Sequence, residues 1–426
     1  MAKIWSVICG IILLCASLQA ESKKPATNKT PKLNIENLRK MYSNGDSTKW
    51  TKAHIDNSVI EDFALELGLL ESRQNLGNQE STLNKQDSTH NLNKRKSALS
   101  ALDSQTRNYV ESQVRAHLEI KPLPKEAPYP AHNPYSKAKR DLGERLFNDP
   151  RLSASNQIAC ASCHDKELGF GDGRSVSYGH DRQLGRRNSP SVVMSAFGTH
   201  KFWDGRAQNL ESQSLFPIAD PKEMAYNADK AVKKLNKIKA YQDEFESVFG
   251  TRKITKELLA QAIATYERSL MPAQNRFDRF LNGNAKGLND EEVLGLHLFR
   301  TKARCINCHN GVALSDERFH NLGLHFYGRE KYEDLGRYEV TKNPSDVGAF
   351  KTPSLRGVSK TAPYMHNGLF PHLRGVVFGY NFGMANPEPK EGKIYNPPFP
   401  KSDEILRPLQ LSDEEIHAIE AFLKVL

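Results

Sequence analysis

The chain has few cysteines for its length, and none of them is free to build a disulfide framework. Six occur in 426 residues, and two of these lie within the first fifteen. The other four form two closely spaced pairs: Cys160 with Cys163, and Cys305 with Cys308. Because every thiol beyond the N-terminus belongs to one of these pairs, we expect no structural disulfide, even in an oxidising compartment.

The sequence also lacks an apolar run long enough to cross a membrane. Its one sustained run, 4–18, is shorter than the roughly 20 residues that a spanning helix needs. Lys3 precedes the run, and the small residue Ala20 ends it just before Glu21. The pattern predicts a cleaved signal peptide over 1–20, with an uncleaved anchor as the alternative, and therefore a periplasmic protein.

Charge of one sign is not gathered in any segment. The 60 Lys and Arg residues outnumber the 50 Asp and Glu residues and give a formal net charge of +10, but the two signs alternate along the chain. Proteins that bind nucleic acid concentrate their basic side chains in a patch or stripe. We therefore expect no nucleic-acid partner and interpret the excess as a solvated surface with a weak preference for acidic partners or an anionic membrane face.

A histidine completes each cysteine pair, so that one pattern occurs twice. The two copies are Cys160-Ala-Ser-Cys163-His164 and Cys305-Ile-Asn-Cys308-His309. In this pattern the two thiols form thioether bonds to haem, and the adjoining histidine is the proximal iron ligand. A zinc site would have to combine donors from both copies, and nothing in the sequence favours that arrangement. The pattern predicts two covalently bound haem c groups and therefore redox chemistry.

The residues before the first motif divide into a polar segment and a proline-rich linker. The segment is rich in Lys, Asn, Ser and Gln, but 59–70 and 106–118 have apolar residues at helical spacing, whereas 77–96 resembles a loop. Prolines recur through 122–130. We predict an N-terminal polar extension and linker over 21–130 that packs on the rest of the protein, with a flexible tether as the alternative.

The rest of the chain contains a weak internal repeat. Leu-Gly-Glu-Arg-Leu-Phe at 142–147 precedes the first motif, and Leu-Gly-Leu-His-Leu-Phe at 294–299 precedes the second. Each has the apolar spacing of a short helix that packs on a haem. Two cytochrome c-like haem domains are expected, one over 131–285 and one over 286–426.

Further helices are predicted between and after the motifs. Residues 229–249 and 255–270 have amphipathic spacing, and the second segment stops just before a proline. Near the end, Ser412 and Glu415 form a capping box that should open a last helix over 416–426. The expected fold is mainly α, with long loops around the haem domains.

Several short segments near the motifs match the pattern of a known family. They are Leu-Phe-Asn-Asp-Pro-Arg-Leu at 146–152, Tyr-Gly-His at 178–180, Arg-Asn-Ser-Pro at 187–190, Phe-Trp-Asp-Gly-Arg at 202–206, Thr-Pro-Ser-Leu-Arg-Gly at 352–357 and Ala-Pro-Tyr-Met-His-Asn-Gly at 362–368. From about residue 133 onward the chain resembles the bacterial di-haem cytochrome c peroxidases, a family that includes the MauG-type enzymes, which oxidise other proteins. The resemblance implies an N-terminal peroxidatic haem domain and a C-terminal electron-transfer haem domain. Family members are often homodimers, which the sequence leaves open for this chain.

The resemblance assigns roles to residues near the first motif. His180 matches the family's distal, switchable ligand of the first haem iron, opposite the proximal His164; a conformational change can free this position. Gln213 and Glu223 match the polar pair above the open face of that iron. A carboxylate there can take a proton from one peroxide oxygen and return it to the other. Glu223 is therefore the expected acid–base catalyst, with Gln213 orienting peroxide or water.

Two further matches lie between the predicted domains. Trp203 corresponds to a tryptophan that relays electrons between the haems, with a structural core residue as the alternative. Asn188 and the carbonyl groups of Thr361 and Pro363 correspond to a calcium site, and hard oxygen donors suit that ion. For the Asn and Pro positions, ordinary turn residues are the alternative.

The second haem departs from the peroxidase pattern. His309 is its predicted proximal ligand, and the peroxidases place a methionine on the opposite face. Counted from His366 without a gap, that position is Tyr380, which is the pattern of the MauG branch, while Met384 is the competing ligand. A thioether raises the haem potential, whereas a phenolate favours ferric and higher oxidation states.

The preferred interpretation is a di-haem c-type peroxidase that reduces hydrogen peroxide to water. Electrons would enter from a small cytochrome c or cupredoxin. One alternative is a MauG-like enzyme that oxidises residues of a partner protein through a bis-ferryl state, although Ala303 and Arg304 stand where the MauG branch has a surface tryptophan. A second alternative is a non-catalytic electron-transfer cytochrome, for which Gln213 and Glu223 would have no use.

Overall fold

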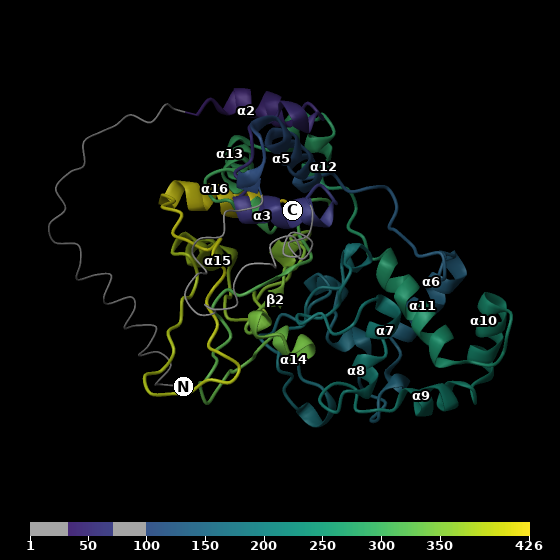
Figure 1. The fold of residues 1–426 in the computed structure, drawn as a ribbon. Coiled ribbons are helices and arrows are strands. Elements are labelled where there is room, and N and C mark those ends of the chain that lie inside the picture. The colour runs from purple at the N-terminus through teal and green to yellow at the C-terminus, as the bar shows by residue number, and fades with distance from the viewer. Residues whose placement is uncertain (1–32, 71–98) are drawn as a thin grey trace, which may run out of the picture. The chain divides into compact units, whose positions relative to one another are not determined.

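Helices and long loops make up nearly all of the described chain (Figure 1). The structure is a computed structural model that describes residues 33–70 and 99–426, so the predicted signal peptide and the loop predicted at 77–96 lie outside the described residues. Within the described ranges the single sheet pairs β1 (Phe319–His320) antiparallel with β2 (Phe350–Lys351). The prediction of a mainly helical protein is confirmed. None of the described helices has the length and apolar character needed to span a membrane.

One hydrophobic cluster surrounds the first motif. Its helices are α6 (Lys137–Phe147), α7 (Leu210–Gln213), α8 (Phe216–Ala219), α9 (Ala228–Leu235), α10 (Lys239–Phe249) and α11 (Lys256–Ser269). Leu142, Leu146 and Ile263 are fully buried where α6 and α11 meet. The two helices approach so closely that a Cβ on Gly143 would stand 2.0 Å from the carbonyl oxygen of Ala262. Only glycine fits at that crossing.

A matching helix crossing, of α13 with α16, lies beside the second motif. The helices of this C-terminal half are α12 (Arg276–Leu281), α13 (Asp290–Arg300), α14 (Tyr338–Thr341), α15 (Leu373–Asn381) and α16 (Asp413–Leu423). A Cβ on Gly295 of α13 would stand 2.0 Å from the carbonyl oxygen of Ala418 on α16. The weak sequence repeat therefore corresponds to a repeated helix pair, α6 with α11 and α13 with α16. In each pair the first helix carries the glycine at the crossing.

The single helix predicted over 229–249 is wrong, because the chain breaks it into α9 and α10. The side chain of Asn236 donates hydrogen bonds to the carbonyls of Val232 and Ile254, each at 2.9 Å, and accepts one from the Ile254 N–H at 3.0 Å. These bonds to a distant segment end α9, and local apolar spacing gives no sign of them. The capping box of Ser412 and Glu415 is present as predicted and opens α16.

The N-terminal segment, called the arm below (residues 35–70 and 99–121), packs on the C-terminal half. Its helices are α2 (Ile35–Tyr42), α3 (Asn57–Glu66) and α5 (Ser104–Leu118); α2 packs on α13, and α3 packs on α5 (Figure 1). Arm and C-terminal half share one hydrophobic cluster, which includes Tyr42, Trp50 and Phe299. Arg300 is 1% exposed and forms a bidentate ion pair with Glu119 of the arm at 2.5 and 2.9 Å.

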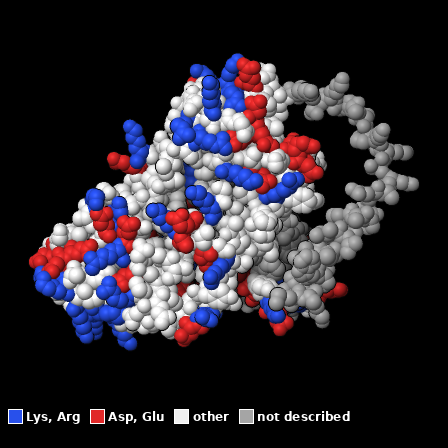
Figure 2. Space-filling model, turned by 180° about the vertical axis from the view of Figure 1, so that it is seen from behind, with Lys and Arg blue, Asp and Glu red and all other residues white. Residues whose placement is uncertain are grey.

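Ion pairs also join the segment around the first motif to the C-terminal half. Arg187 bonds both carboxylate oxygens of Asp334 at 2.7 Å and one oxygen of Asp204 at 2.5 Å. All three side chains are at most 11% exposed, so water screens these charges weakly. Elsewhere, basic and acidic side chains are intermixed over the face seen in Figure 2, as the sequence predicts.

Candidate functional site

Both motifs fold in the same way. Residues 160–162 and 305–307 each form a single 3₁₀ turn, and the N–H of the following histidine bonds the carbonyl of the first cysteine. All four cysteines are free and partly exposed. Burial raises the pKa of every one of these thiols, that of Cys305 to about 12. The four thiols are therefore protonated and free in this structure.

The motif histidines are held in one tautomer. His164 Nδ1 donates to the carbonyl of Phe170 at 3.0 Å, and His309 Nδ1 donates to the carbonyl of Leu314 at 2.9 Å. Burial lowers the pKa of both rings, so both are neutral. A neutral imidazole that donates from Nδ1 keeps the lone pair of Nε2 free for a metal. Each histidine is thus prepared to act as an iron ligand.

One cavity of about 800 Å³ is lined by both motifs. Most of the predicted site residues line it too: Cys160, Cys163, His164, Asn188, Trp203, Gln213, Glu223, Cys305, Cys308, His309, Thr361, Pro363 and Tyr380. The polar atoms Gln213 Oε1 and Glu267 Oε2 are buried there without a hydrogen-bond partner in the described protein. Free thiol pairs, prepared histidines and unpartnered polar atoms around one cavity fit covalently bound haem c at each motif.

Glu223 is a half-buried carboxyl group of this cavity. Burial raises its pKa, repulsion from Asp220 raises it further, and Arg206 opposes the shift. The N–H of His180 donates to the carbonyl of Glu223 at 2.8 Å. Gly179 makes this approach possible, because a Cβ there would stand 1.9 Å from the carbonyl oxygen of Lys222. Tyr-Gly-His therefore needs its glycine to dock the His180 loop against the predicted acid–base residue.

The side chain of His180 is a predicted iron ligand that the structure does not bring into the cavity. Gly179 lines the cavity, whereas the ring of His180 is not among the lining residues. Its Nε2 lies 3.5 Å from Asp181 Oδ2, and its Nδ1 is buried without a partner. Asp181 and Arg182 have φ values of 52° and 58°, in the left-handed region that side-chain-bearing residues seldom adopt. Its role as a distal ligand stays a prediction.

Trp203 connects the two halves of the protein. Its Nε1 donates to the carbonyl of Asn188 at 2.9 Å, and its own carbonyl accepts from the N–H of Lys351 at 2.8 Å. Its ring makes an edge contact with His366, which is 4% exposed and has a pKa lowered to about 3 by burial. A tryptophan held from both sides at the cavity wall has a fixed orientation.

The predicted calcium ligands lie around the same wall. Asn188 is 8% exposed, and its Nδ2 donates to the carbonyl of Arg174 at 2.8 Å, which leaves Oδ1 as the free acceptor. Thr361 and Pro363 line the cavity as well. Among the described residues, the cluster of His, Cys and acidic side chains with metal-binding spacing is a different one, Cys308 with Asp316 and His320. Calcium at Asn188 stays a prediction.

The two candidates for the distal position of the second site are placed differently. Tyr380, on α15, lines the cavity, and burial raises its pKa well above the usual range. Met384 does not line the cavity, and its Sδ packs 3.2 Å from the position of a Cβ on Gly379. Of the two side chains, only that of Tyr380 faces the space beside the second motif.

The structure adds functional candidates that the sequence interpretation missed. His320 lies between two carboxylates, with Nε2 2.8 Å from Asp316 and Nδ1 2.5 Å from Asp403, and it lines the cavity. Burial lowers the pKa of this ring, but Cys308 and the hydrogen bonds to the two carboxylates raise it well above the ordinary value, so the ring is a charged imidazolium. Glu267 lies in the helix predicted over 255–270 and continues the apolar face of Ala260 and Ile263; a charge on that face is the signal that marks it.

Comparison with known proteins places these features in one family. A family model described as di-haem cytochrome c peroxidase matches residues 137–286. The chain is 36% identical over 341 residues to the cytochrome-c peroxidase IdrP1 of Pseudomonas sp. (strain SCT), covering 73% of this chain and 86% of that protein. It is 34% identical over 307 residues to the methylamine utilization protein MauG of Methylorubrum extorquens, covering 71% and 82%.

Solved structures agree with the sequence relatives. A crystal structure of a MauG-like protein associated with microbial copper homeostasis matches with a TM-score of 0.64 and 32% identity, covering 71% of this chain and 94% of that one. The diheme peroxidase BthA from Burkholderia thailandensis matches with a TM-score of 0.57 at 24% identity, covering 69% and 87%, and supports the fold alone. The chain is a haem-binding oxidoreductase. It belongs to the di-haem cytochrome c peroxidase family, and its membership implies haem c at the two motifs.

Proposed function

We propose that the protein is a periplasmic peroxidase that reduces hydrogen peroxide to water with electrons from a small cytochrome c or cupredoxin. The observation that carries this proposal is the position of Glu223 and Gln213 in the cavity of the first motif. A haem site that only transfers electrons has no use for a titratable carboxyl group beside an unpartnered amide oxygen. The relatives named as cytochrome c peroxidases support the same activity.

The residues of the first site divide the work of peroxide cleavage. Haem held by Cys160, Cys163 and His164 would supply the iron and the electrons for the reaction with peroxide. Gln213 Oε1, which is buried without a partner, would accept a hydrogen bond from peroxide and orient it. Glu223 takes the proton from one peroxide oxygen and returns it to the departing one, a role that a carboxyl group with a raised pKa can perform in both directions.

His180 is proposed to control access to this site. Its loop is tied to Glu223 through the backbone hydrogen bond, so that a movement of one displaces the other. The left-handed conformations of Asp181 and Arg182 hold strain that a change of loop conformation would release. In the described arrangement the ring stays outside the cavity, which leaves room for peroxide.

A MauG-like oxidation of a partner protein is the second candidate, and Tyr380 favours it. The cavity-lining position of Tyr380 supports it over Met384 as the distal ligand of the haem at His309. A phenolate ligand suits a haem that holds oxidising equivalents better than one that takes in electrons at high potential. The match to a solved MauG-like protein at 32% identity is in keeping with this candidate.

Trp203 and the predicted calcium ligands serve both candidates. Trp203 is proposed to pass electrons between the haems, since it is fixed at the wall that both motifs share. Asn188, Thr361 and Pro363 are proposed to bind calcium and thereby to hold the residues around Trp203 in place.

One measurement separates the two candidates. The fully oxidised protein is mixed with one equivalent of hydrogen peroxide, and its optical and EPR spectra are followed. A peroxidase of the gated kind should not react until one haem has been reduced, and should then turn over with a reduced donor. A long-lived spectral change at both haems without prior reduction would instead establish the MauG-like reaction. Reaction with peroxide in neither state would contradict both.

A further inference from the structure

Glu267 is a buried carboxyl group that the proposed peroxide chemistry does not use. It lies on α11, is 3% exposed and lines the cavity of the two motifs. Its Oε2 has no hydrogen-bond partner in the described protein. A charged carboxylate left unpaired in such a place is costly, so the group has a strong tendency to hold a proton. Burial accordingly raises its pKa to about 8.

The nearby positive charges do not neutralise Glu267 directly. Arg268, the next residue on α11, forms a bidentate ion pair with Glu211 at 2.6 and 2.7 Å. Lys201 is 8% exposed, and its Nζ donates to two backbone carbonyls at 2.6 and 2.5 Å. Both cations lower the pKa of Glu267 through space, but neither donates a hydrogen bond to it. The proton affinity of Glu267 is therefore set by burial and by distant charges.

Lys201 connects Glu267 with a carboxylate nearer the surface. Ser195 links Lys201 to the backbone of Glu267: the backbone carbonyl of Ser195 accepts a hydrogen bond from Lys201 Nζ, and the Ser195 hydroxyl donates to the backbone carbonyl of Glu267 at 3.3 Å. On its other side Lys201 faces Glu317 across Gly198. The position of a Cβ on Gly198 lies 3.1 Å from Lys201 Nζ and 2.6 Å from Glu317 Oε2. Lys201 thus stands between partly exposed Glu317 and the part of α11 that carries buried Glu267.

Glu267 also acts on the first motif. After burial, its negative charge is the largest cause that raises the pKa of Cys160. Charges interact strongly across a poorly hydrated interior, and the interaction is mutual. An electron that arrives at the haem bound to Cys160 adds negative charge there, and it must therefore raise the proton affinity of Glu267.

We propose that Glu267 is the proton acceptor coupled to reduction of the haem held by Cys160 and Cys163, with Lys201 and Glu317 as its entry path. The donor protein gives one electron to the haem iron, and one proton from solvent binds Glu267 Oε2 and converts the carboxylate into a carboxylic acid. The buried net charge is unchanged by the two transfers together. The inference deepens the proposed function and depends on it only for the source of the electron.

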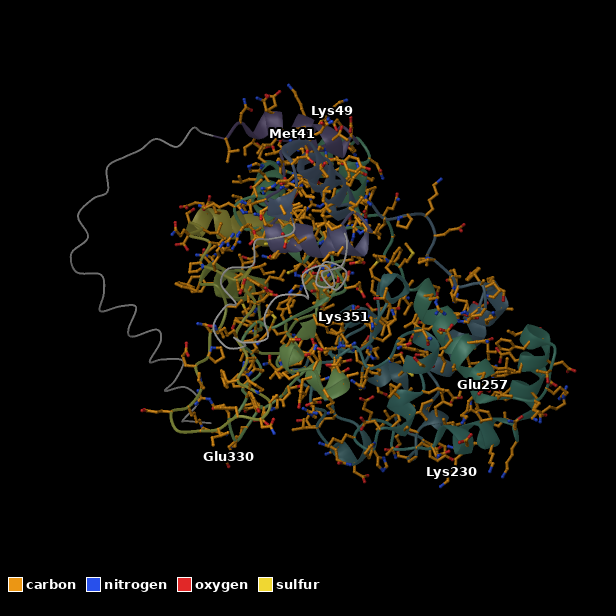
Figure 3. The ribbon with its side chains drawn as sticks, viewed as in Figure 1. Met41, Lys49, Lys230, Glu257, Glu330 and Lys351 are labelled. Carbon is orange, nitrogen blue, oxygen red and sulfur yellow. The ribbon has the colours of Figure 1, made fainter. Side chains whose placement is uncertain are left out.

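The charged groups around Glu267 set the pH range of this coupling. Lys201 and Arg268 lower its pKa, whereas Glu211 raises it. Lys201 itself has a pKa lowered to about 8 by burial, raised by Glu317 and lowered by Lys351, which is labelled in Figure 3. Two interacting groups with similar pKa values titrate as a pair. The coupling is expected within about one unit of pH 8.

A pH series of spectroelectrochemical titrations on the holoprotein tests the proposal. In the wild type, the potential of the first haem should fall as the pH rises through 8. The limiting slope for one proton per electron is about 59 mV for each tenfold change in proton concentration. E267Q keeps the shape of the side chain but cannot take up a proton, so its slope should vanish. E257Q, at an exposed position of the same helix labelled in Figure 3, should keep it.

A pH slope in E267Q equal to that of the wild type would overturn the proposal. If E267Q does not fold, two other measurements decide. K201M removes a charge that lowers the pKa of Glu267 and should move the sloping region to higher pH, and an unmoved region would count against the assignment. The redox-difference infrared spectrum of the wild type at pH 8 should gain a carboxylic acid band on reduction, and a spectrum without it would overturn the proposal. Because an electrode supplies the electron, absent peroxidase activity would contradict the proposed function alone.

Discussion

Beneath the first motif, α6 crosses α11 at Gly143, and beneath the second, α13 crosses α16 at Gly295. The motif histidines both donate from Nδ1 to a backbone carbonyl a few residues downstream. The two halves therefore orient their proximal histidine in the same way, through a hydrogen bond from Nδ1 to a backbone carbonyl. They differ in what faces the cavity from the other side and in what covers the outer surface, so the functional division must originate there.

Opposite the first motif the side chains are polar and can exchange protons. Glu223 has a raised pKa, and Gln213 carries an unpartnered oxygen. Beside the second motif stand the phenol of Tyr380 and the imidazolium of His320, whose two nitrogens are both engaged by carboxylates. A fixed charge suits a haem whose surroundings do not change during turnover.

The outer surface of the second motif is covered by the arm. Asp56 forms an ion pair with Arg304 at 2.9 Å, and its N–H donates to the side chain of Asn307 at 2.8 Å. Asn307 in turn donates to the carbonyl of His54. The arm therefore fixes residues inside and next to the second motif, whereas no described residue of the arm makes such a contact with residues 160–164. One site is left adaptable and the other is held rigid.

The largest effect is expected from removing the acid–base group of the adaptable site. E223Q should slow the reaction with peroxide by about 100- to 10,000-fold, with both haems still attached. In the wild type the rate should fall as the pH drops through the raised pKa of Glu223, because protonation removes the base. Stopped-flow rates against pH measure both effects. D220N removes a repulsion that raises the pKa of Glu223, so the fall in rate should occur at lower pH in this variant. If the fall stays at the same pH, a group other than Glu223 causes it.

The rigid site can be loosened through Asp56. Its side chain is 10% exposed and that of Arg304 is 8% exposed, and breaking a buried pair by removing one partner costs about 3–5 kcal/mol. D56A should therefore lower the stability of the arm and alter the spectrum of the second haem while leaving the first unchanged. Chemical denaturation and EPR check this. D290A removes an exposed partner of Arg39 and should cost at most about 1 kcal/mol. Equal changes at both haems in D56A would contradict the assignment of the arm to one site.

The ligand contrast between the haems can be reversed at Tyr380. Y380M should raise the potential of the second haem by on the order of 0.1 V, within the roughly 0.8 V range that axial ligands control, because a thioether stabilises ferrous iron. M384L should leave the potential as it is, since Met384 lies outside the cavity. Redox titration of both variants is the measurement. The opposite pattern would make Met384 the ligand.

The sequence predicts what local pattern and short motifs encode, and it misses what distant segments decide. The cysteine pairs, the helices before them and the capping box of Ser412 follow from spacing along the chain. The break at Asn236 depends on a hydrogen bond to Ile254, eighteen residues away. The burial of Glu267 depends on its position against a cavity that the folded chain creates. The sequence predicts that the arm packs on the rest of the protein, but it does not show where; the folded chain seats Tyr42 and Trp50 on a face contributed by the C-terminal half.

The smallest effect expected is a change in how stability depends on pH. The pKa of Glu267 is about 8 in the folded protein and about 4.3 in an unfolded chain. Between these values the folded state keeps a proton that the unfolded state has released, so stability falls as the pH rises, by at most about 1.4 kcal/mol per unit. The buried rings of His366 and His325 oppose this trend below about pH 6.5, because their lowered pKa values make the unfolded state the better proton binder there. Thermal unfolding from pH 6.5 to 8 should therefore show a steeper loss in the wild type than in E267Q, where glutamine has no proton to release. Parallel curves would mean that Glu267 is already ionised in the folded protein. Glu267 would then no longer support the contrast between a proton-accepting first site and a fixed second site.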